Sequence, residues 1–556
     1  MRPNLIDATA IRQAGRHLGT IFLMGALSSS IWGAAPPLLD AAKSDNLPAV
    51  QRLIKERAEV NATAGDGSSA LLWAVFNSNV DMTKALLTAG AAVDAPNRYG
   101  VTPLLQASRN GDAEVMKALL DAGAQATRWH PEGETPLMAA SRTGKVDAVK
   151  LLLARGSFIN ATDPIEEQTA LMWASAEGHV EVVKTLLAAG GDPNLKAHVS
   201  QLTQRKNSDH ASGGLTALMF AARNGHSGVV KALMAGKADP KLTNADGATA
   251  TVIAIVNDRF DLAKELLDLG ADPNDGSLFF AVDMHDATTD MRAHDGSRLQ
   301  PNHPNNLTAL GLVKVLLDLG ADANKPFVGT LHSTTLCCAS AIKSSPFYRA
   351  ATAADVDALK ALLAKGGKLD WSPSKIPADG KGPAGGGRAG PTADYTPLMA
   401  ALKGGQGASF AAGPGFSRLV APPFREPGSR DPVEAVKVLL AAGADPNVKV
   451  GDGSTALHQA VQAQQVALVR TLVAAGAVLD AVNKDKLTPL GLAEKLKSTP
   501  APVSTVNDEE AYRPKRDSRE DIVVALRELM HLGPNDPVPA PPAVPAEPDP
   551  KAKPAQ

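Results

Sequence analysis

The chain has 556 residues, of which 44% are hydrophobic and only 4% aromatic. Its formal net charge is −2, so no overall positive field favours nucleic acid or an anionic membrane, and any electrostatic role must be local. The two cysteines, Cys337 and Cys338, are adjacent and cannot join distant segments. This excludes a disulfide framework, and we expect both to be small buried residues.

Residues 1–35 differ from the rest of the chain. Arg2, Arg12 and Arg16 precede an uncharged stretch at 18–32, and Gly33-Ala34-Ala35 offers small residues for a signal peptidase. This pattern is typical of a secretory signal peptide, and the apolar stretch is short for a membrane span. An uncleaved anchor and a hydrophobic N-terminus without function are the alternatives. We expect export to the periplasm or the medium, with no membrane span after cleavage.

From residue 36 onward a unit of 33 residues repeats, most plainly at 101–133. Thr102 can cap a helix whose first turn suits Pro103, and Gly111 ends that helix. A second apolar pattern of helical period stops at Gly123, which suits the left-handed end of a helix. Neither of these two short helices can bury its apolar face alone, so copies of the unit must stack.

Copies of the unit run through the chain. The tetrapeptide that opens the first helix begins at positions 69, 102, 135, 169, 216, 249, 396, 455 and 488, and five of these steps are 33 or 34 residues. The second helix ends in LLDAGA, LLAAGG, LLDLGA or a similar motif, often followed by a D-x-N turn, as at 272–274 and 445–447. These motifs resemble the ankyrin repeat family, and residues 215–247 follow most of the family's pattern. The resemblance implies an all-α solenoid of helix–turn–helix units with β-hairpin loops, with about twelve repeats between residues 36 and 533.

The repeats are not evenly spaced. Residues 36–327 hold repeats one to eight, 328–393 a degenerate ninth repeat and a Gly/Pro-rich loop, and 394–533 repeats ten to twelve with a polar C-terminal cap. The Pro/Ala-rich residues 534–556 are expected to be disordered. The first insertion should extend a hairpin, the second should emerge at the opposite rim, and the interrupted repeats eight to ten should be the weak joint. The insertions lie at 196–214, 285–308, 371–393, 404–431 and 498–518.

No catalytic constellation is recognisable, so we predict a protein that is not an enzyme and needs no cofactor. His458 occupies the family's T-P-L-H position, where the resemblance implies that its imidazole bonds to backbone and joins adjacent hairpins. Trp73 and Trp173 share one register, which indicates packing in the core.

One loop carries residue types that could bind a divalent metal. Their spacing fits no common closed site, so a solvated loop is the preferred interpretation. A metal- or cofactor-associated periplasmic protein that uses residues 285–303 is nevertheless the alternative function, and an enzyme with its site in an insertion is a third. The residues concerned are His285, Asp286, Asp290, His294, Asp295 and His303.

The resemblance implies that partners bind to the concave surface, at hairpin tips and at the pair of residues before each interhelix turn. Repeat packing should leave these positions free, and exposed Arg, Tyr and Trp are frequent interface anchors. We predict a monomeric scaffold that binds a protein partner through repeats two to six and does not bind nucleic acid. The predicted partner-binding residues are Phe76, Arg98, Tyr99, Arg109, Asn110, Trp129, His130, Arg142, Glu177, Arg223 and Asn224.

Overall fold

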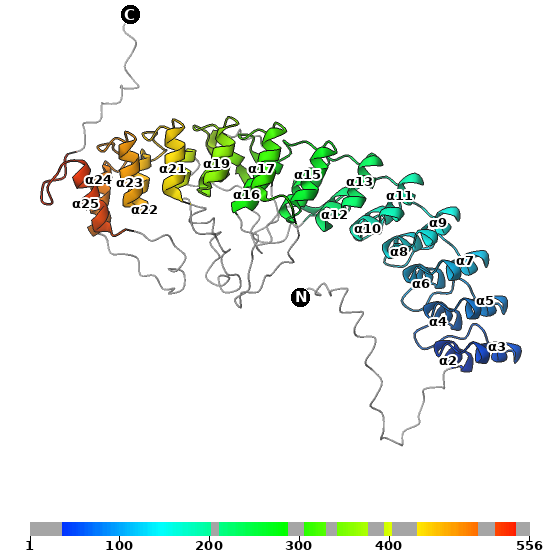
Figure 1. Cartoon of the computed structure of the whole chain (residues 1–556). Coiled ribbons are helices and arrows are strands. Elements are labelled where there is room, and N and C mark those ends of the chain that lie inside the picture. Colours follow the sequence, from blue (N-terminus) through cyan, green and yellow to red (C-terminus); the bar gives the residue numbers. More distant parts are fainter. Residues whose placement is uncertain are drawn as a thin grey trace, which may run out of the picture.

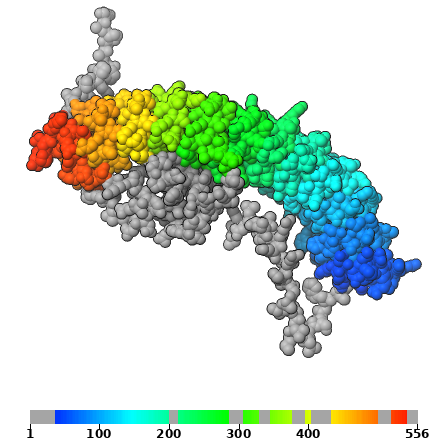
Figure 2. Space-filling model, in the orientation of Figure 1, coloured from blue at the N-terminus to red at the C-terminus, as the bar shows by residue number. Residues whose placement is uncertain are grey.

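The computed structural model describes residues 36–201, 211–286, 305–329, 342–375, 394–402, 431–498 and 517–540. These residues form twelve helix pairs that stack into a curved solenoid, as Figure 1 shows from the blue N-terminal repeat to the red C-terminal one. The space-filling view shows the same stack as one continuous arc (Figure 2). The expected all-α solenoid of about twelve repeats is confirmed. The expected signal peptide and both cysteines lie outside the described residues.

Each repeat contributes one helix to the concave side of the arc and one to its convex side (Figure 1). The first, inner helices are α2 (Pro37–Lys43), α4 (Ala70–Phe76), α6 (Pro103–Asn110), α8 (Pro136–Thr143), α10 (Ala170–Ala176), α12 (Ala217–Asn224), α14 (Ala250–Val256), α16 (Ser277–Asp286), α18 (Pro346–Thr352), α20 (Pro397–Leu402), α22 (Ala456–Ala463) and α24 (Pro489–Ser498). The second, outer helices are α3 (Leu47–Lys55), α5 (Val80–Thr88), α7 (Ala113–Asp121), α9 (Val146–Ala154), α11 (Val180–Ala188), α13 (Ser227–Ala235), α15 (Phe260–Asp268), α17 (Ala309–Asp318), α19 (Val356–Leu363), α21 (Pro432–Ala441), α23 (Val466–Ala474) and α25 (Arg519–Leu529).

The helix boundaries follow from local chemistry, and repeat three is typical. The Thr102 hydroxyl accepts a hydrogen bond from the Leu105 N–H at 3.2 Å, which satisfies a free donor of the first turn. Gly111 ends the inner helix with φ 69°, and Gly123 follows the outer helix with φ 95°. Both values lie in the left-handed region that glycine adopts without steric cost. The predicted caps are therefore confirmed.

Inner helices pack on inner helices and outer helices on outer helices, so one hydrophobic core runs through the described repeats. Ala107, Ala140 and Ala174 occupy the same register in α6, α8 and α10, and all three are completely buried. Leu119 and Met116 of α7 are equally buried on the outer layer. Small residues at the helix contacts allow close approach, which accounts for the abundance of alanine and the shortage of aromatic residues.

A loop that we call a finger joins each outer helix to the next inner helix. Neighbouring fingers are linked through backbone: Arg98 N–H donates to the Asp66 carbonyl at 2.9 Å, and Lys484 N–H to the Asp452 carbonyl at 2.8 Å. The insertion at 196–214 extends its finger by antiparallel pairing of β1 (Val199–Gln201) with β2 (Ala211–Gly213), as predicted. A second extended finger pairs β3 (Phe327–Gly329) with β4 (Ile342–Ser344).

The recurrent asparagine of the D-x-N turn clamps one repeat to the next. The Asn447 side chain donates to the Gly476 carbonyl at 3.0 Å and accepts from the Val478 N–H at 2.8 Å. Asn274 makes the same pair of bonds, to the Gly320 carbonyl and from the Asp322 N–H. These bonds satisfy main-chain groups just past the end of an outer helix, so the turn motif reports stacking.

The finger between repeats seven and eight is missing, because α15 and α16 are joined by residues 269–276 alone. A pocket of about 420 Å³ lies at this gap, and Lys241 and Lys325 are among the residues that line it. Phe327 packs on its floor, with its ring centre 4.8 Å from that of Phe280. The row of fingers is therefore interrupted, although the helices continue to stack.

Repeats eight and nine are joined by two side-chain contacts. Arg349 Nε lies 2.6 Å from Asp283 Oδ1, and His285 Nδ1 lies 2.5 Å from Asp355 Oδ2. The expected division at residue 327 falls within β3, and the described helices stack on both sides of it. Residues 287–304, 376–393, 403–430 and 499–516 lie outside the described ranges, and with them most of the predicted rim insertion at 285–308. Of the expected disordered tail, residues 534–540 are described and contain no helix or strand.

Candidate functional site

The last turns of the inner helices carry exposed side chains on the concave side, because the outer helices cover the other side of each repeat. Phe76 of α4 is 58% exposed, and its ring packs edge-on against Trp73 with 5.7 Å between ring centres. Arg142 of α8 and Arg223 of α12 are exposed in the same register. Glu177 follows α10 and is also exposed. These four positions match the predicted concave surface.

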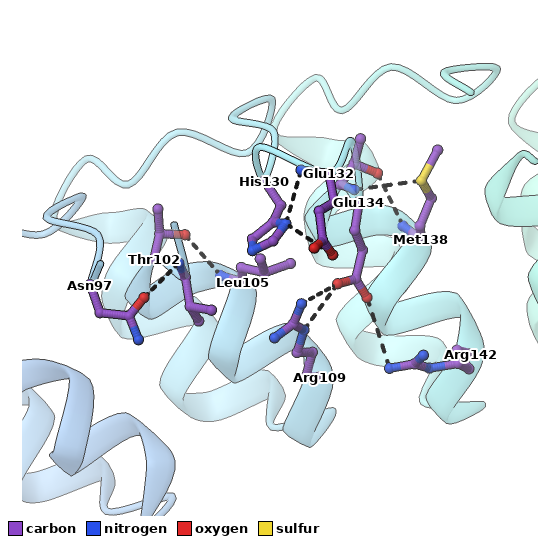
Figure 3. Close-up of polar contacts among 11 residues, drawn as sticks. Asn97, Thr102, Leu105, Arg109, His130, Glu132, Glu134, Met138 and Arg142 are labelled. Carbon is purple, nitrogen blue, oxygen red and sulfur yellow. Dashed lines mark hydrogen bonds and ion pairs between the residues drawn. The ribbon is translucent and has the colours of Figure 1, made fainter. Parts of the chain in front are cut away.

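A carboxylate that the sequence did not single out lies between two of the predicted arginines. Glu134 ends a finger, and its Oε2 lies 2.5 Å from Arg109 Nη2 while its Oε1 lies 3.8 Å from Arg142 Nη2. Figure 3 shows Glu134 pointing between the two guanidinium groups. Arg109 is therefore half-buried and paired, and only Arg142 keeps much of its charge available to solvent.

Two of the aromatic side chains on the concave side support cations. The Arg142 guanidinium carbon lies 5.1 Å from the centre of the Trp173 ring, and that of Arg223 lies 5.0 Å from the Phe220 ring. Both distances are within the range of favourable cation–π attraction. Trp173 is half-buried, so the packing interpretation holds for part of its ring, while another part supports Arg142. Trp73 is also half-buried and carries Lys43 Nζ at 5.3 Å.

The predicted asparagines are not left free by repeat packing, contrary to expectation. Asn110 donates its side-chain N–H to the Val75 carbonyl at 2.9 Å, and Asn224 donates to the Ala176 carbonyl at 2.7 Å. Each acceptor lies at the end of the preceding inner helix and has a second donor, the Ser78 N–H for Val75 and His226 Nε2 for Ala176. Both asparagines therefore link adjacent repeats, and little of their hydrogen-bonding capacity remains for a partner.

The fingertips place three large side chains in solvent in consecutive fingers. Tyr99 is 69% exposed and Trp129 46% exposed, as the sequence suggested, and Arg98 beside Tyr99 is exposed too. Ile165, in the next finger, is 59% exposed and was not predicted. We call Tyr99, Trp129 and Ile165 the fingertip row. Ile165 follows Pro164, which lies 33 residues after Pro131 and therefore holds the same place in the next finger. This register could have indicated from the sequence that Ile165 lies at a fingertip.

His130 was expected to be exposed, and this expectation is wrong. It is only 8% exposed, its Nδ1 accepts the Glu132 N–H at 3.1 Å, and its own backbone N–H donates to the Glu134 carbonyl at 2.9 Å. Figure 3 shows the bond between the imidazole and the Glu132 backbone. The side chain shapes the finger from within and does not present a surface.

The repeat pattern that carries these residues matches a known family. A family model described as "Ankyrin repeats (3 copies)" matches residues 38–128, 126–197, 198–277 and 428–500, which together make up more than half of the chain. The chain belongs to the ankyrin repeat family. Among solved structures, the ankyrin repeat domain of human ASB11 is 30% identical over 39% of this chain and 91% of that domain, with a TM-score of 0.34. No curated protein matches the chain.

Ankyrin repeats generally mediate interactions between proteins, and the fold typically serves as a non-enzymatic scaffold. In this ankyrin chain, His458 acts within the fold as the resemblance implied. Its Nδ1 accepts the Thr455 N–H at 3.2 Å, and its Nε2 donates to the Leu487 carbonyl of the next repeat at 3.1 Å. Burial lowers the pKa of His458, so the neutral tautomer that these bonds require is favoured.

Within the described ankyrin repeats, no group of three or more His, Cys, Asp or Glu side chains is placed to hold a metal ion. His285 bonds to Asp355, and most of the 285–303 loop of the alternative function lies outside the described residues. No helix in the described ranges is long and apolar enough to cross a membrane.

Proposed function

We propose that this ankyrin protein is a non-enzymatic scaffold that binds a protein partner through the concave face and fingertips of repeats two to six. The observation that carries the proposal is the gathering of exposed aromatic and arginine side chains on four of the five repeats from two to six. Phe76, Tyr99, Trp129, Arg142 and Arg223 belong to repeats two, three, four and six or to the fingers that join them. Stacking does not require an exposed side chain at these positions.

The residue types support a protein ligand. Tyr, Trp and Arg dominate the energetics of protein interfaces because they combine large apolar area with directed polar groups. A nucleic-acid ligand would need many phosphate contacts, and each contact would need a cation. The net charge of −2 gives no overall attraction for phosphates, and the pairing of Arg109 with Glu134 removes one cation from the concave face, so neither supports that mode of binding.

The proposal is tested by capture of the native partner. The full chain with a C-terminal affinity tag is cross-linked in the envelope fraction of its own organism, and captured proteins are identified by mass spectrometry. We expect Tyr99→Ser combined with Trp129→Ser to reduce capture of a specific protein at least tenfold. Leu319→Ser, which removes an exposed apolar side chain of repeat eight, is the matched control and should leave capture unchanged. Equal capture by all three chains would contradict the proposed site.

Export and oligomeric state are part of the proposal. The N-terminal pattern of charged, apolar and small residues supports a cleaved signal at 1–35 and a periplasmic or secreted protein. Mass spectrometry of the protein from the envelope fraction should give the mass of a chain that begins near residue 36. Light scattering of that protein should give the mass of one copy, and a dimer mass would contradict the proposed monomer.

A further inference from the structure

Four residues of the concave face form what we call the cationic platform: Arg142, Trp173, Phe220 and Arg223. They lie on α8, α10 and α12, three consecutive inner helices. Each arginine is exposed and rests over an aromatic ring at about 5 Å, as given above. A ring beneath a guanidinium restricts its motion and leaves its N–H edge directed to solvent, so less entropy is lost when an anion binds.

The charge of the platform is incompletely neutralised. Glu134 approaches Arg142 only to 3.8 Å and is already bonded to Arg109, so one carboxylate serves two guanidinium groups. No carboxylate of the described residues lies within ion-pair distance of Arg223. Partial desolvation lowers the pKa of Arg223, because burial disfavours its charged form. A bound anion would stabilise that charged form. Glu177 lies on the same stretch, is exposed, and forms no ion pair with either arginine.

The spacing of the two arginines restricts what could neutralise both. Packed helices lie about 8–10 Å apart, and Arg142 and Arg223 occupy equivalent positions two helices apart, so their backbones are separated by roughly 16–20 Å. One phosphate group is far too small to span that distance. An extended peptide advances about 3.3 Å per residue, so it covers the interval in roughly five or six residues. The half-buried ring of Trp173 lies on α10 between the two arginines and suits an apolar side chain between the charges, whereas Phe220 is buried beneath Arg223.

We propose that the cationic platform binds an extended acidic segment of the partner, with two carboxylates roughly five or six residues apart on either side of an apolar side chain. This inference rests on the proposed function, since it specifies the partner that the concave face takes. The carboxylates pair with Arg142 and Arg223, and the segment crosses α8, α10 and α12.

The test uses the full mature chain and a fluorescein-labelled peptide of about twelve residues, with two glutamates roughly five residues apart and a phenylalanine between them. Fluorescence anisotropy should show saturable binding that weakens with salt. Arg142→Gln and Arg223→Gln should each weaken binding about tenfold, the usual scale for loss of a charge-assisted hydrogen bond. Glu177→Gln should tighten it about two- to threefold by removing a repulsive charge.

Two controls separate a specific site from general charge attraction. Lys150→Gln removes an exposed cation of outer helix α9 and should leave the affinity unchanged. A peptide with adjacent glutamates, and one with glutamines in their place, should bind at least tenfold more weakly. Circular dichroism melting of each variant confirms that it is folded.

Several outcomes would overturn the inference. They are the absence of binding at millimolar peptide, equal affinity for the glutamine peptide, or unchanged affinity in both arginine variants. Tighter binding of a peptide that has one phosphoserine and no glutamate would assign the platform to a phosphorylated ligand instead. If Tyr99→Ser with Trp129→Ser abolishes capture of the native partner while Arg142→Gln and Arg223→Gln do not, the proposed function stands and the acidic segment is wrong.

Discussion

Asn110 and Val75 are joined by a hydrogen bond of 2.9 Å that runs from one repeat to the repeat before it. The amide also lies 3.2 Å from the Ser78 hydroxyl, so it fills the space around the end of α4. We expect Asn110→Ala to lower the free energy of unfolding by about 1–2 kcal/mol, since the bond between the two repeats is lost and the Val75 carbonyl keeps only the Ser78 N–H as donor. Urea denaturation followed by circular dichroism measures the change. Lys150→Ala on the exposed side of α9 is the control, and an equal effect of both substitutions would show that the link contributes nothing.

Gly133 and Gly123 offer a matched pair of substitutions. Both have positive φ, 90° and 95°, so alanine at either position costs about 1–2 kcal/mol of backbone strain. A Cβ on Gly123 meets open space, whereas one on Gly133 would lie 1.8 Å from Cδ of Pro164. Gly133→Ala should therefore destabilise the fold by about 1–3 kcal/mol more than Gly123→Ala. Addition of Pro164→Ala should remove that excess, and a strictly additive double variant would contradict the steric explanation.

His458 should make the stability of the C-terminal repeats depend on pH. Burial lowers its pKa in the folded chain below 6.5, so the unfolded chain binds a proton more readily. Folding stability is then fully present above pH 6.5 and falls as the pH decreases toward the folded pKa, by at most about 1.4 kcal/mol per pH unit. Hydrogen exchange of residues 454–498 at several pH values measures this loss. His458→Gln should flatten the dependence, and an unchanged slope would assign it to other groups.

Glu134 and Asp121 each lie between two cations but differ in burial. Glu134 is mostly buried between Arg109 and Arg142, while Asp121 lies in solvent between Lys117 and Arg155. Glu134→Gln should lower the free energy of unfolding by about 1–2 kcal/mol, because a half-buried guanidinium loses its countercharge. Asp121→Asn should cause no measurable change, since solvent screens its pairs. Urea titrations of the two variants compare them directly, and an equal loss would contradict the role of burial.

The sequence was sufficient to predict the repeat unit, because Thr102, Pro103 and Gly111 set the ends of a helix through contacts with residues only a few positions away. Their caps and turns depend on local geometry that every copy shares. Asn110 was misjudged because its partner, Val75, belongs to the neighbouring repeat. His130 was misjudged because its partner, Glu132, is brought to it by the geometry of its own finger.

The cationic platform could be predicted from the sequence only in part. Arg142 and Arg223 were predicted from their register, but their aromatic supports were not. The ring beneath Arg142 belongs to Trp173, in the next repeat along the chain. A single repeat therefore does not contain the pair, and the pattern within one unit could not reveal it. Glu134 was missed for the same reason, since its two arginines come from different helices.

The missing finger between α15 and α16 limits how far a ligand can follow the edge of the solenoid. The row of fingers has a gap there, between Gly247 and Phe327, while the inner helices α14 and α16 stay packed on each other. A ligand that binds along the fingertips from the N-terminal end would therefore meet no further finger after repeat seven until β3 and β4. The gap therefore separates the fingers of repeats one to seven from the extended finger of β3 and β4.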